Sequence, residues 1–164
     1  MTNFDWTCFT RKIAVKANMV DIYNAWTRSS DIEKWFLSKA VFYDQTHTIR
    51  ASDRCIAAGD TYAWNWHLFP VTEYGKILRA NGTDVVQFTF AGDCLVDIQL
   101  HMQDGNCIVT LTQSNIPTDE ESMRSIRLGC DTGWCFYLVN LKSVFEGGLD
   151  LRNRDEYLPG MLNM

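Results

Sequence analysis

The first third of the chain changes from the hydrophobic period of a strand to that of a helix. Apolar and polar residues alternate from Phe9 to Val15, which predicts a strand with one buried face. Asn18 is a favourable N-cap, and the apolar residues between Val20 and Trp26 have near-helical spacing. Ser30-x-x-Glu33 has the pattern of a capping box. The sequence therefore predicts a strand followed by two short helices.

Alternating segments dominate the middle of the chain, from about Ala40 to Gln113, and predict a run of strands. In one of them Tyr62, Trp64 and Trp66 alternate with smaller or polar residues, which places three large rings on one face of a strand. The segment 45–58 has mixed polar content, and we expect a mobile loop there.

Tight-turn signals connect the predicted strands. A strand is expected around 74–78, beyond Pro70, and Asn81-Gly82 should connect it to the next one. Asp104-Gly105 predicts a second such hairpin, so the joined strands should be antiparallel neighbours. The apolar residues that alternate along these strands are Val86, Phe88, Phe90, Val96, Ile98, Leu100, Met102, Val109 and Leu111.

A long helix is predicted after Pro117. Thr118-x-x-Glu121 has the pattern of a capping box at its start, and Gly147-Gly148 should end it. Phe136 and Val139 fall outside its main apolar stripe, so the helix should be covered on two sides. The stripe consists of Cys130, Trp134, Leu138, Leu141 and Phe145.

These elements predict an α+β protein, in which a curved antiparallel sheet of six or seven strands wraps around the long C-terminal helix. A length of 164 residues fits one domain, 1–164. We expect its core to span 7–148 and a hydrophobic tail, 149–164, to pack on the domain or on a second subunit.

The order of the elements resembles the helix-grip fold of the SRPBCC superfamily, the START and birch-pollen-allergen-like proteins. Particular motifs are similar to the small bacterial members of the family named for the activator of the heat shock protein 90 ATPase. At the start of the chain these motifs are Phe9 to Val15, Ile22-x-x-x-Trp26-Thr27 and Ile32-x-x-Trp35-Phe36. At its end they are Val109 to Ser114, Ile116-Pro117, Gly133-Trp134, Leu138, Leu141-Lys142 and Glu146-Gly147.

The resemblance covers roughly Phe9 to Gly148 and implies a cavity between sheet and helix. Ala57-Ala58-Gly59-Asp60 stands where bacterial members often carry a Gly-Gly turn, so the loop beside the cavity mouth should differ. The eukaryotic activator couples this kind of domain to a separate N-terminal domain that works on the chaperone. We expect no second domain of that kind within these 164 residues, so a co-chaperone-like role is expected only as an alternative.

Charge and cysteine usage exclude several classes of protein. The net charge is −5 and there is no basic run, so no nucleic-acid partner is expected. No segment approaches the roughly 20 apolar residues of a membrane span, and we expect a cytoplasmic protein without membrane contact. The six cysteines form no C-x-x-C pair and His47, His67 and His101 are isolated, so neither a metal nor a cofactor is expected. The cysteines should be reduced and should pack as small hydrophobic side chains in the interior.

Aromatic residues make up 13% of the chain and supply the candidate ligand site. If the helix stands away from the sheet, rings from both would border a cavity for a small hydrophobic or aromatic molecule. The same side chains could instead interdigitate as a dry core. The candidate ligand-binding residues are Trp26, Trp35, Trp64, Trp66, Phe88, Phe90, Trp134, Leu138 and Leu141.

No catalytic constellation is predicted. His67 and His101 fall on the polar sides of their segments without a visible partner, and Arg127 and Asp131 are expected to form a surface ion pair. Three functions stay open at this point. They are a carrier or sensor of a small hydrophobic molecule, a protein-interaction module with a second copy of the chain (a homodimer) as one candidate partner, and a cyclase or hydrolase acting on a lipid-like substrate.

Overall fold

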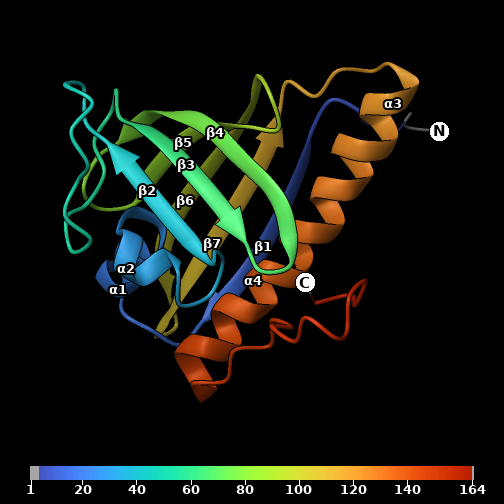
Figure 1. The fold of residues 1–164 in the computed structure, drawn as a ribbon. Helices are drawn as coiled ribbons and strands as arrows, with labels where there is room; N and C mark the ends of the chain where they lie inside the picture. The colour runs from blue at the N-terminus through green and yellow to red at the C-terminus, as the bar shows by residue number, and fades with distance from the viewer. Residues whose placement is uncertain (1–3, 164) are drawn as a thin grey trace.

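A computed structural model of the chain describes residues 4–163 and contains a single seven-stranded antiparallel sheet (Figure 1). The strand order is β1-β7-β6-β5-β4-β3-β2. The strands are β1 (Phe9–Val15), β2 (Lys39–Tyr43), β3 (Thr61–Trp66), β4 (Phe69–Ala80), β5 (Val85–Phe90), β6 (Cys94–Gln103) and β7 (Asn106–Ser114). The helices are α1 (Met19–Thr27), α2 (Ser29–Ile32), α3 (Glu120–Ser122), a π-helical segment η1 (Met123–Leu128) and α4 (Gly129–Gly147).

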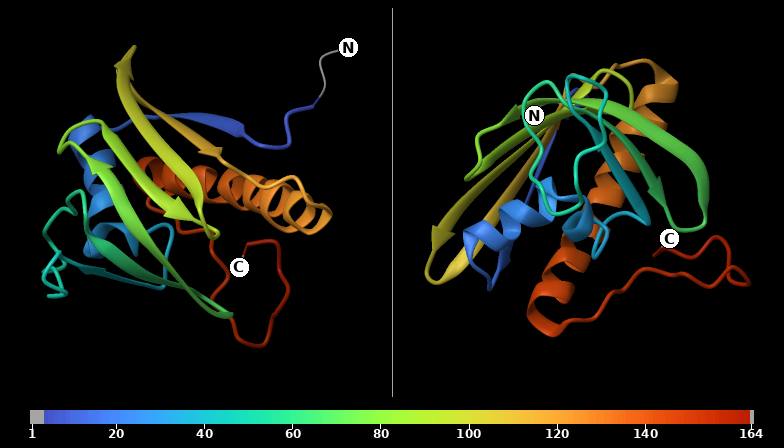
Figure 2. Two further views of the ribbon diagram at one scale, coloured as in Figure 1. Left: turned by 90° about the horizontal axis from the view of Figure 1, so that it is seen from above. Right: turned by 60° about the vertical axis from the view of Figure 1, so that its left-hand side comes forward.

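The sheet curves around α4, and α1 and α2 cover its remaining opening (Figures 1 and 2). This arrangement confirms the predicted α+β helix-grip fold, with two short helices after the first strand. The curvature matters for function because a helix lying across a bent sheet touches it unevenly and leaves a wedge at one end.

Both predicted hairpin turns are present. Asn81-Gly82 lies in the turn between β4 and β5, and Asp104-Gly105 joins β6 to β7, where Gln103 pairs with Asn106. Gly82 and Gly105 have φ angles of 85° and 76°, a left-handed conformation that glycine adopts without steric cost. The α4 helix also ends as predicted, at Gly148 with a φ of 70°.

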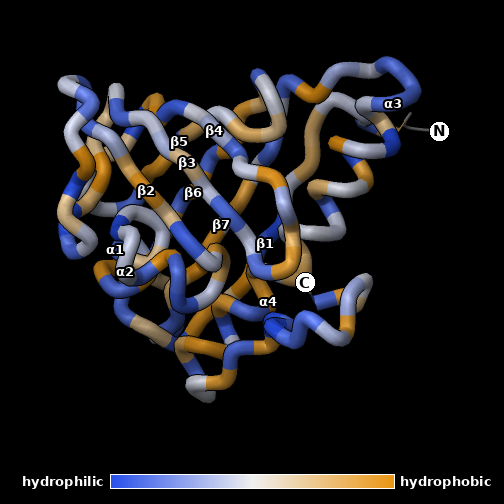
Figure 3. The backbone as a smooth tube through the Cα atoms, in the orientation of Figure 1, coloured by the Kyte–Doolittle hydropathy of each residue, from blue (hydrophilic) through white to orange (hydrophobic). Residues whose placement is uncertain are grey.

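The β4 strand is longer than the sequence pattern indicates. It begins at Phe69, so Pro70 lies inside it rather than before it. A proline is tolerated there because this end of β4 pairs with β3 alone, while β5 pairs with β4 only from Ile77 onward. Because β4 begins at Phe69, the turn between β3 and β4 contains only His67 and Leu68, and Figure 3 shows both hydrophilic and hydrophobic colour at this bend.

Neither predicted capping box forms. The Ser30 hydroxyl donates to the carbonyl of Ser52, and the Glu33 carboxylate accepts from the backbone N–H of Ala40. At the second site the N-cap is Asp119, one residue later than predicted, whose side chain accepts from the Ser122 N–H.

The core between sheet and helices is rich in aromatic rings. Trp26 meets Trp35 edge to face with ring centroids 4.7 Å apart, and Tyr62 stacks on Trp64 at 3.8 Å. The rings of β3 therefore share one face, as their alternation predicts.

Six free cysteines lie within the described residues, two of them buried and Cys135 exposed.

The tail after α4 returns to the body of the protein through Arg152, whose side chain is buried. Its guanidinium donates to the carbonyls of Leu37 and Glu33 and to Asp150. Asn140 of α4 also donates to Asp150. Beyond this attachment the tail leaves large apolar side chains exposed at Tyr157, Leu158, Met161 and Leu162.

The ion pair between Arg127 and Asp131 forms, with Nη1 and Oδ2 2.8 Å apart, but it is not a surface pair. The Arg127 side chain is only 5% exposed and its guanidinium lies 4.8 Å from the ring centroid of Phe9. Arg11 joins the same carboxylate from β1, so the pair connects the start of the long helix to the edge of the sheet.

Among residues 4–163, no helix has the length and hydrophobicity required to cross a membrane.

Candidate functional site

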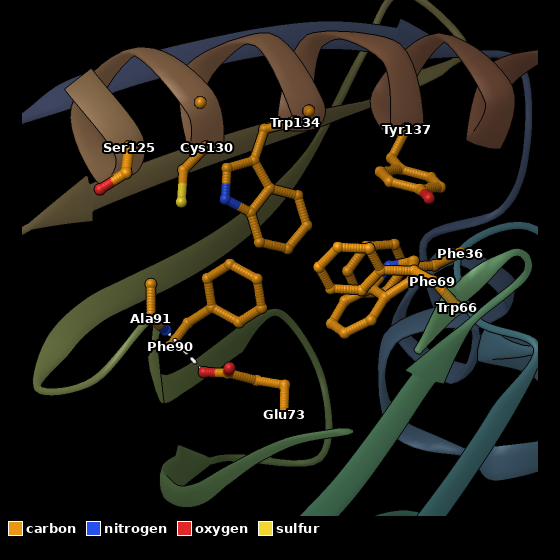
Figure 4. Close-up of a pocket in the computed structure, with 12 residues that line it drawn as sticks. Phe36, Trp66, Phe69, Glu73, Phe90, Ala91, Ser125, Cys130, Trp134 and Tyr137 are labelled. Carbon is orange, nitrogen blue, oxygen red and sulfur yellow. Dashed lines mark hydrogen bonds between the residues drawn. The ribbon is translucent and has the colours of Figure 1, made fainter. Parts of the chain in front are cut away.

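A cavity of about 400 Å³ lies between α4 and the ends of β3, β4 and β5 (Figure 4). Six of the side chains around it are aromatic. The lining residues are Phe36, Trp66, Phe69, Glu73, Phe90, Ala91, Ser125, Gly129, Cys130, Gly133, Trp134 and Tyr137.

Two glycines keep the helical wall of the cavity open. Gly129 and Gly133 lie one turn apart on the side of α4 that lines the cavity. A Cβ added at Gly133 would meet no atom within 4 Å, apart from its chain neighbours and the backbone of its own helix. Glycine inside a helix costs roughly 0.5–1 kcal/mol relative to alanine. The helix therefore gives up some stability at the point where a side chain would reduce the cavity.

Trp134 forms the centre of the helical wall, and a buried hydrogen bond fixes its orientation. The indole Nε1 donates to Oε1 of Gln113 on β7 over 2.9 Å. Because Gln113 is fully buried, water does not compete for this bond. The indole ring lies 5.0 Å from Phe36 and 5.2 Å from Phe90, centroid to centroid, so helix and sheet meet at the floor of the cavity.

Rings from the sheet and from the segment after α2 complete the walls. Phe36 meets Trp66 edge to face at 5.5 Å and Tyr137 at 4.8 Å. The pairing of β3 with β4 changes register between Trp64 and Trp66, and beyond this irregularity Trp66 pairs with Phe69. The ring centroids of Trp66 and Phe69 are 6.4 Å apart. Phe69 is about half exposed, so it stands at the mouth of the cavity.

Few polar groups reach the cavity. Burial raises the pKa of Cys130 to about 11 and that of Tyr137 to about 12. Both are therefore protonated at neutral pH, and the thiol is not a ready nucleophile. Ser125 donates its hydroxyl to the carbonyl of Glu121. Glu73 is the one lining residue with a charged side chain.

The nine residues proposed from the sequence fall into two groups. Trp66, Phe90 and Trp134 line the cavity. The other six are at most 2% exposed and lie in the packed core: Trp26, Trp35, Trp64, Phe88, Leu138 and Leu141. Of their indole groups, Trp35 donates to the carbonyl of Ala25, whereas Nε1 of Trp26 and of Trp64 lacks a hydrogen-bond partner within residues 4–163.

Several lining residues were absent from the sequence-based site. Tyr137 lies one helical turn from Trp134, and Gly129-x-x-x-Gly133 inside a predicted helix was a usable signal for a small-residue face. Glu73 is harder to predict from the sequence, because the predicted strand around 74–78 does not include it, whereas β4 begins at Phe69. No group of three or more His, Cys, Asp or Glu side chains between residues 4 and 163 is arranged to hold a metal ion.

The sequence matches the family described as "Activator of Hsp90 ATPase homolog 1-like protein" over residues 16–146, and the chain belongs to that family. This confirms the resemblance that its opening and closing motifs indicated. None of the curated proteins that were compared matches the chain.

Solved structures share the fold at low sequence identity. The Aha1 dimer of Colwellia psychrerythraea superposes with a TM-score of 0.68 at 20% identity, covering 86% of this chain and 97% of the other. A Staphylococcus saprophyticus protein superposes with a TM-score of 0.68 at 17% identity, covering 88% of this chain and 96% of the other. DynU16, from the dynemicin biosynthetic locus, superposes with a TM-score of 0.69 at 14% identity, covering 90% of this chain and 50% of the other. These likenesses establish the fold and not a shared ligand.

Proposed function

We propose that the cavity beneath α4 binds a small hydrophobic or aromatic molecule, and that the protein is a carrier or sensor of it. The observation that carries the proposal is an aromatic-walled space of about 400 Å³, within the usual size of small-molecule sites. Rings offer flat apolar surfaces that suit aromatic or polycyclic ligands.

The glycines at positions 129 and 133 support a binding role over a packing defect. A helix that only had to cover the sheet would gain stability from alanine or a larger residue at Gly133, where there is open space. The sequence instead leaves this space open. The six predicted residues in the packed core would support the walls in this proposal rather than touch the ligand.

A cavity-filling variant tests the proposal. Naphthylmethanol, a neutral bicyclic probe, should bind the native protein with one site in isothermal titration calorimetry. Gly133→Phe places a ring in the cavity, and the affinity should fall at least about tenfold, while the free energy of unfolding stays equal or rises. Val139→Phe adds the same ring on the exposed side of α4 and should bind like the wild type. Equal binding by all three proteins, or no binding by the wild type, would exclude the cavity as the site.

Self-association is a second candidate function, favoured by the exposed apolar side chains on and after α4. Val139 is 51% exposed, and Tyr157 and Leu162 are 93% and 86% exposed. Large exposed apolar groups on neighbouring elements are typical of interaction surfaces. The Aha1 of Colwellia psychrerythraea, which has the same fold, is a dimer, although the likeness itself extends only to the fold.

Substitutions in the tail test self-association better than a deletion after Leu149, because a deletion would also remove the buried Arg152. Sedimentation of the wild type should show a dimer at micromolar concentration, and the Tyr157→Ser/Leu162→Ser variant should be monomeric with unchanged stability. A wild type that stays monomeric up to about millimolar concentration would refute this candidate.

A further inference from the structure

Glu73 places a carboxylate on the inward side of β4. Residues 69, 71, 73, 75 and 77 of this strand share one face by alternation, and Ile77 of that set is buried in the core. Phe69 and Val71 of the set are exposed and Glu73 is half-buried, so its carboxylate lies between solvent and core. Glu73 lines the cavity there, on the sheet side and opposite the helix that carries Trp134 (Figure 4).

The carboxylate is held in place but not neutralised. One oxygen, Oε1, accepts a hydrogen bond from the backbone N–H of Ala91 over 2.7 Å, which ties the side chain to the end of β5. Between residues 4 and 163, none of the ion pairs involves Glu73. The cavity lining contains no lysine, arginine or histidine. A negative charge thus borders an otherwise apolar space without a counter-ion from the chain.

Aromatic rings share the cavity with this charge. Burial is the main reason that the pKa of the Cys130 thiol rises, and the negative charge of Glu73 is the smallest of the contributions that raise it. The rings of Phe90 and Trp134, with centroids 5.2 Å apart, line the same space, and aromatic rings attract cations through the negative potential of their π systems. A carboxylate beside aromatic faces is an arrangement that favours organic cations.

We propose that the cavity is selective for organic cations, namely molecules with an apolar or aromatic body and one ammonium or amidinium group directed at Glu73. The inference rests on the proposed ligand-binding function and specifies its ligand class. The body would lie against the rings of Phe36, Phe90 and Trp134, and the cationic group would supply the counter-ion that Glu73 lacks.

Glu73 could alternatively serve only to hold the Ala91 N–H at the end of β5. Glu73→Gln separates the two roles, because the amide oxygen of glutamine can still accept that hydrogen bond while the charge is lost. Asp93→Asn is the matched control, since Asp93 is an exposed carboxylate in the turn after β5 and does not line the cavity.

Three probes of nearly equal shape measure the selectivity by calorimetry at neutral pH: naphthylmethylamine, which is protonated there, neutral naphthylmethanol and anionic naphthoate. The wild type and Asp93→Asn should bind the ammonium about tenfold more tightly than the alcohol, and the alcohol more tightly than the carboxylate. In Glu73→Gln, the ammonium and the alcohol should bind within about twofold of each other. Affinity for the alcohol should not fall.

Two results would overturn the inference. If the wild type binds the alcohol as tightly as the ammonium, or if Glu73→Gln keeps the preference, cation selection fails while ligand binding in the cavity stands. If none of the three probes binds the wild type, the proposed function fails together with the inference.

Discussion

The ring of Tyr62 lies directly over the backbone of Gly75, its partner across β3 and β4. A Cβ built on Gly75 would come within 2.4 Å of the Tyr62 hydroxyl oxygen. The ring cannot move away easily, because it stacks on Trp64 at 3.8 Å and its hydroxyl donates to the carbonyl of Thr89 over 2.6 Å. Gly75 is therefore required for the close packing of β3 on β4.

Replacing Gly75 with alanine should lower the free energy of unfolding by about 1–3 kcal/mol, because the tyrosine ring must shift against packed neighbours. Urea denaturation followed by circular dichroism measures the loss. Gly147→Ala, at a helical position where an added Cβ meets nothing within 4 Å, should cost nothing. Equal effects of the two substitutions would contradict this packing argument.

Trp134→Phe should destabilise the protein by about 2–3 kcal/mol. The substitution leaves the buried Oε1 of Gln113 without its donor and enlarges the cavity. The exposed neighbour on the same helix, Val139→Ala, should change stability by less than about 0.5 kcal/mol. A loss below about 1 kcal/mol for Trp134→Phe would mean that the hydrogen bond does not hold helix and sheet together.

Asp131 receives Arg11 and Arg127 on a single oxygen, at 2.5 and 2.8 Å. Asp131→Asn should cost about 2–4 kcal/mol, because the mostly buried Arg127 would lose its counter-charge. Lys34→Gln removes the exposed pair with Asp31 and should cost less than about 0.5 kcal/mol. Thermal melts of both variants at low salt compare the two pairs, and similar losses would show that burial of the first pair is unimportant.

Attachment of the tail should weaken in acid through Asp150. Burial alone would raise the pKa of this carboxyl, but hydrogen bonds from Arg152 and Asn140 and the charge of Arg152 together hold it well below its usual range. A depressed pKa in the folded state stabilises the fold above the unfolded pKa, near 4, and this contribution is lost as the pH falls toward the folded value.

The wild type should therefore be more stable than Asp150→Asn by a constant amount above about pH 5, with the difference shrinking below about pH 4. Measuring the free energy of unfolding of both proteins from about pH 7 to about pH 2 gives this difference at each pH. A difference that stays constant down to about pH 2 would show that the Asp150 carboxylate is not coupled to folding.

Periodicity along the chain predicted the fold well, because alternation and turn chemistry are local. Asn81-Gly82 and Asp104-Gly105 each define a hairpin without reference to the rest of the molecule. Pro70 was misplaced because its tolerance depends on where β5 stops pairing, which is a tertiary property. The capping residues Ser30 and Glu33 were misassigned for a similar reason, since the loop carbonyl of Ser52 and the N–H of Ala40 compete for them.

The cavity was less predictable than the fold. Alternation shows which face of a strand is buried, but not how far the helix lies from each part of that face. Trp64 and Trp66 share a face, yet the first is packed in the core and the second lines the cavity, because the register changes between them. Helical spacing likewise placed Leu138 beside Trp134 without distinguishing packed from open space.

Indole N–H resonances in a proton–nitrogen NMR titration with naphthylmethanol locate the ligand, because Trp66 and Trp134 line the cavity and Trp6 does not. If the ligand binds in the cavity, the signals of Trp66 and Trp134 should shift most and saturate together, while that of Trp6, near the N-terminus and outside the cavity, should stay unchanged. Shifts confined to Trp6, or the absence of any saturable shift, would contradict a ligand site between the helix and the sheet.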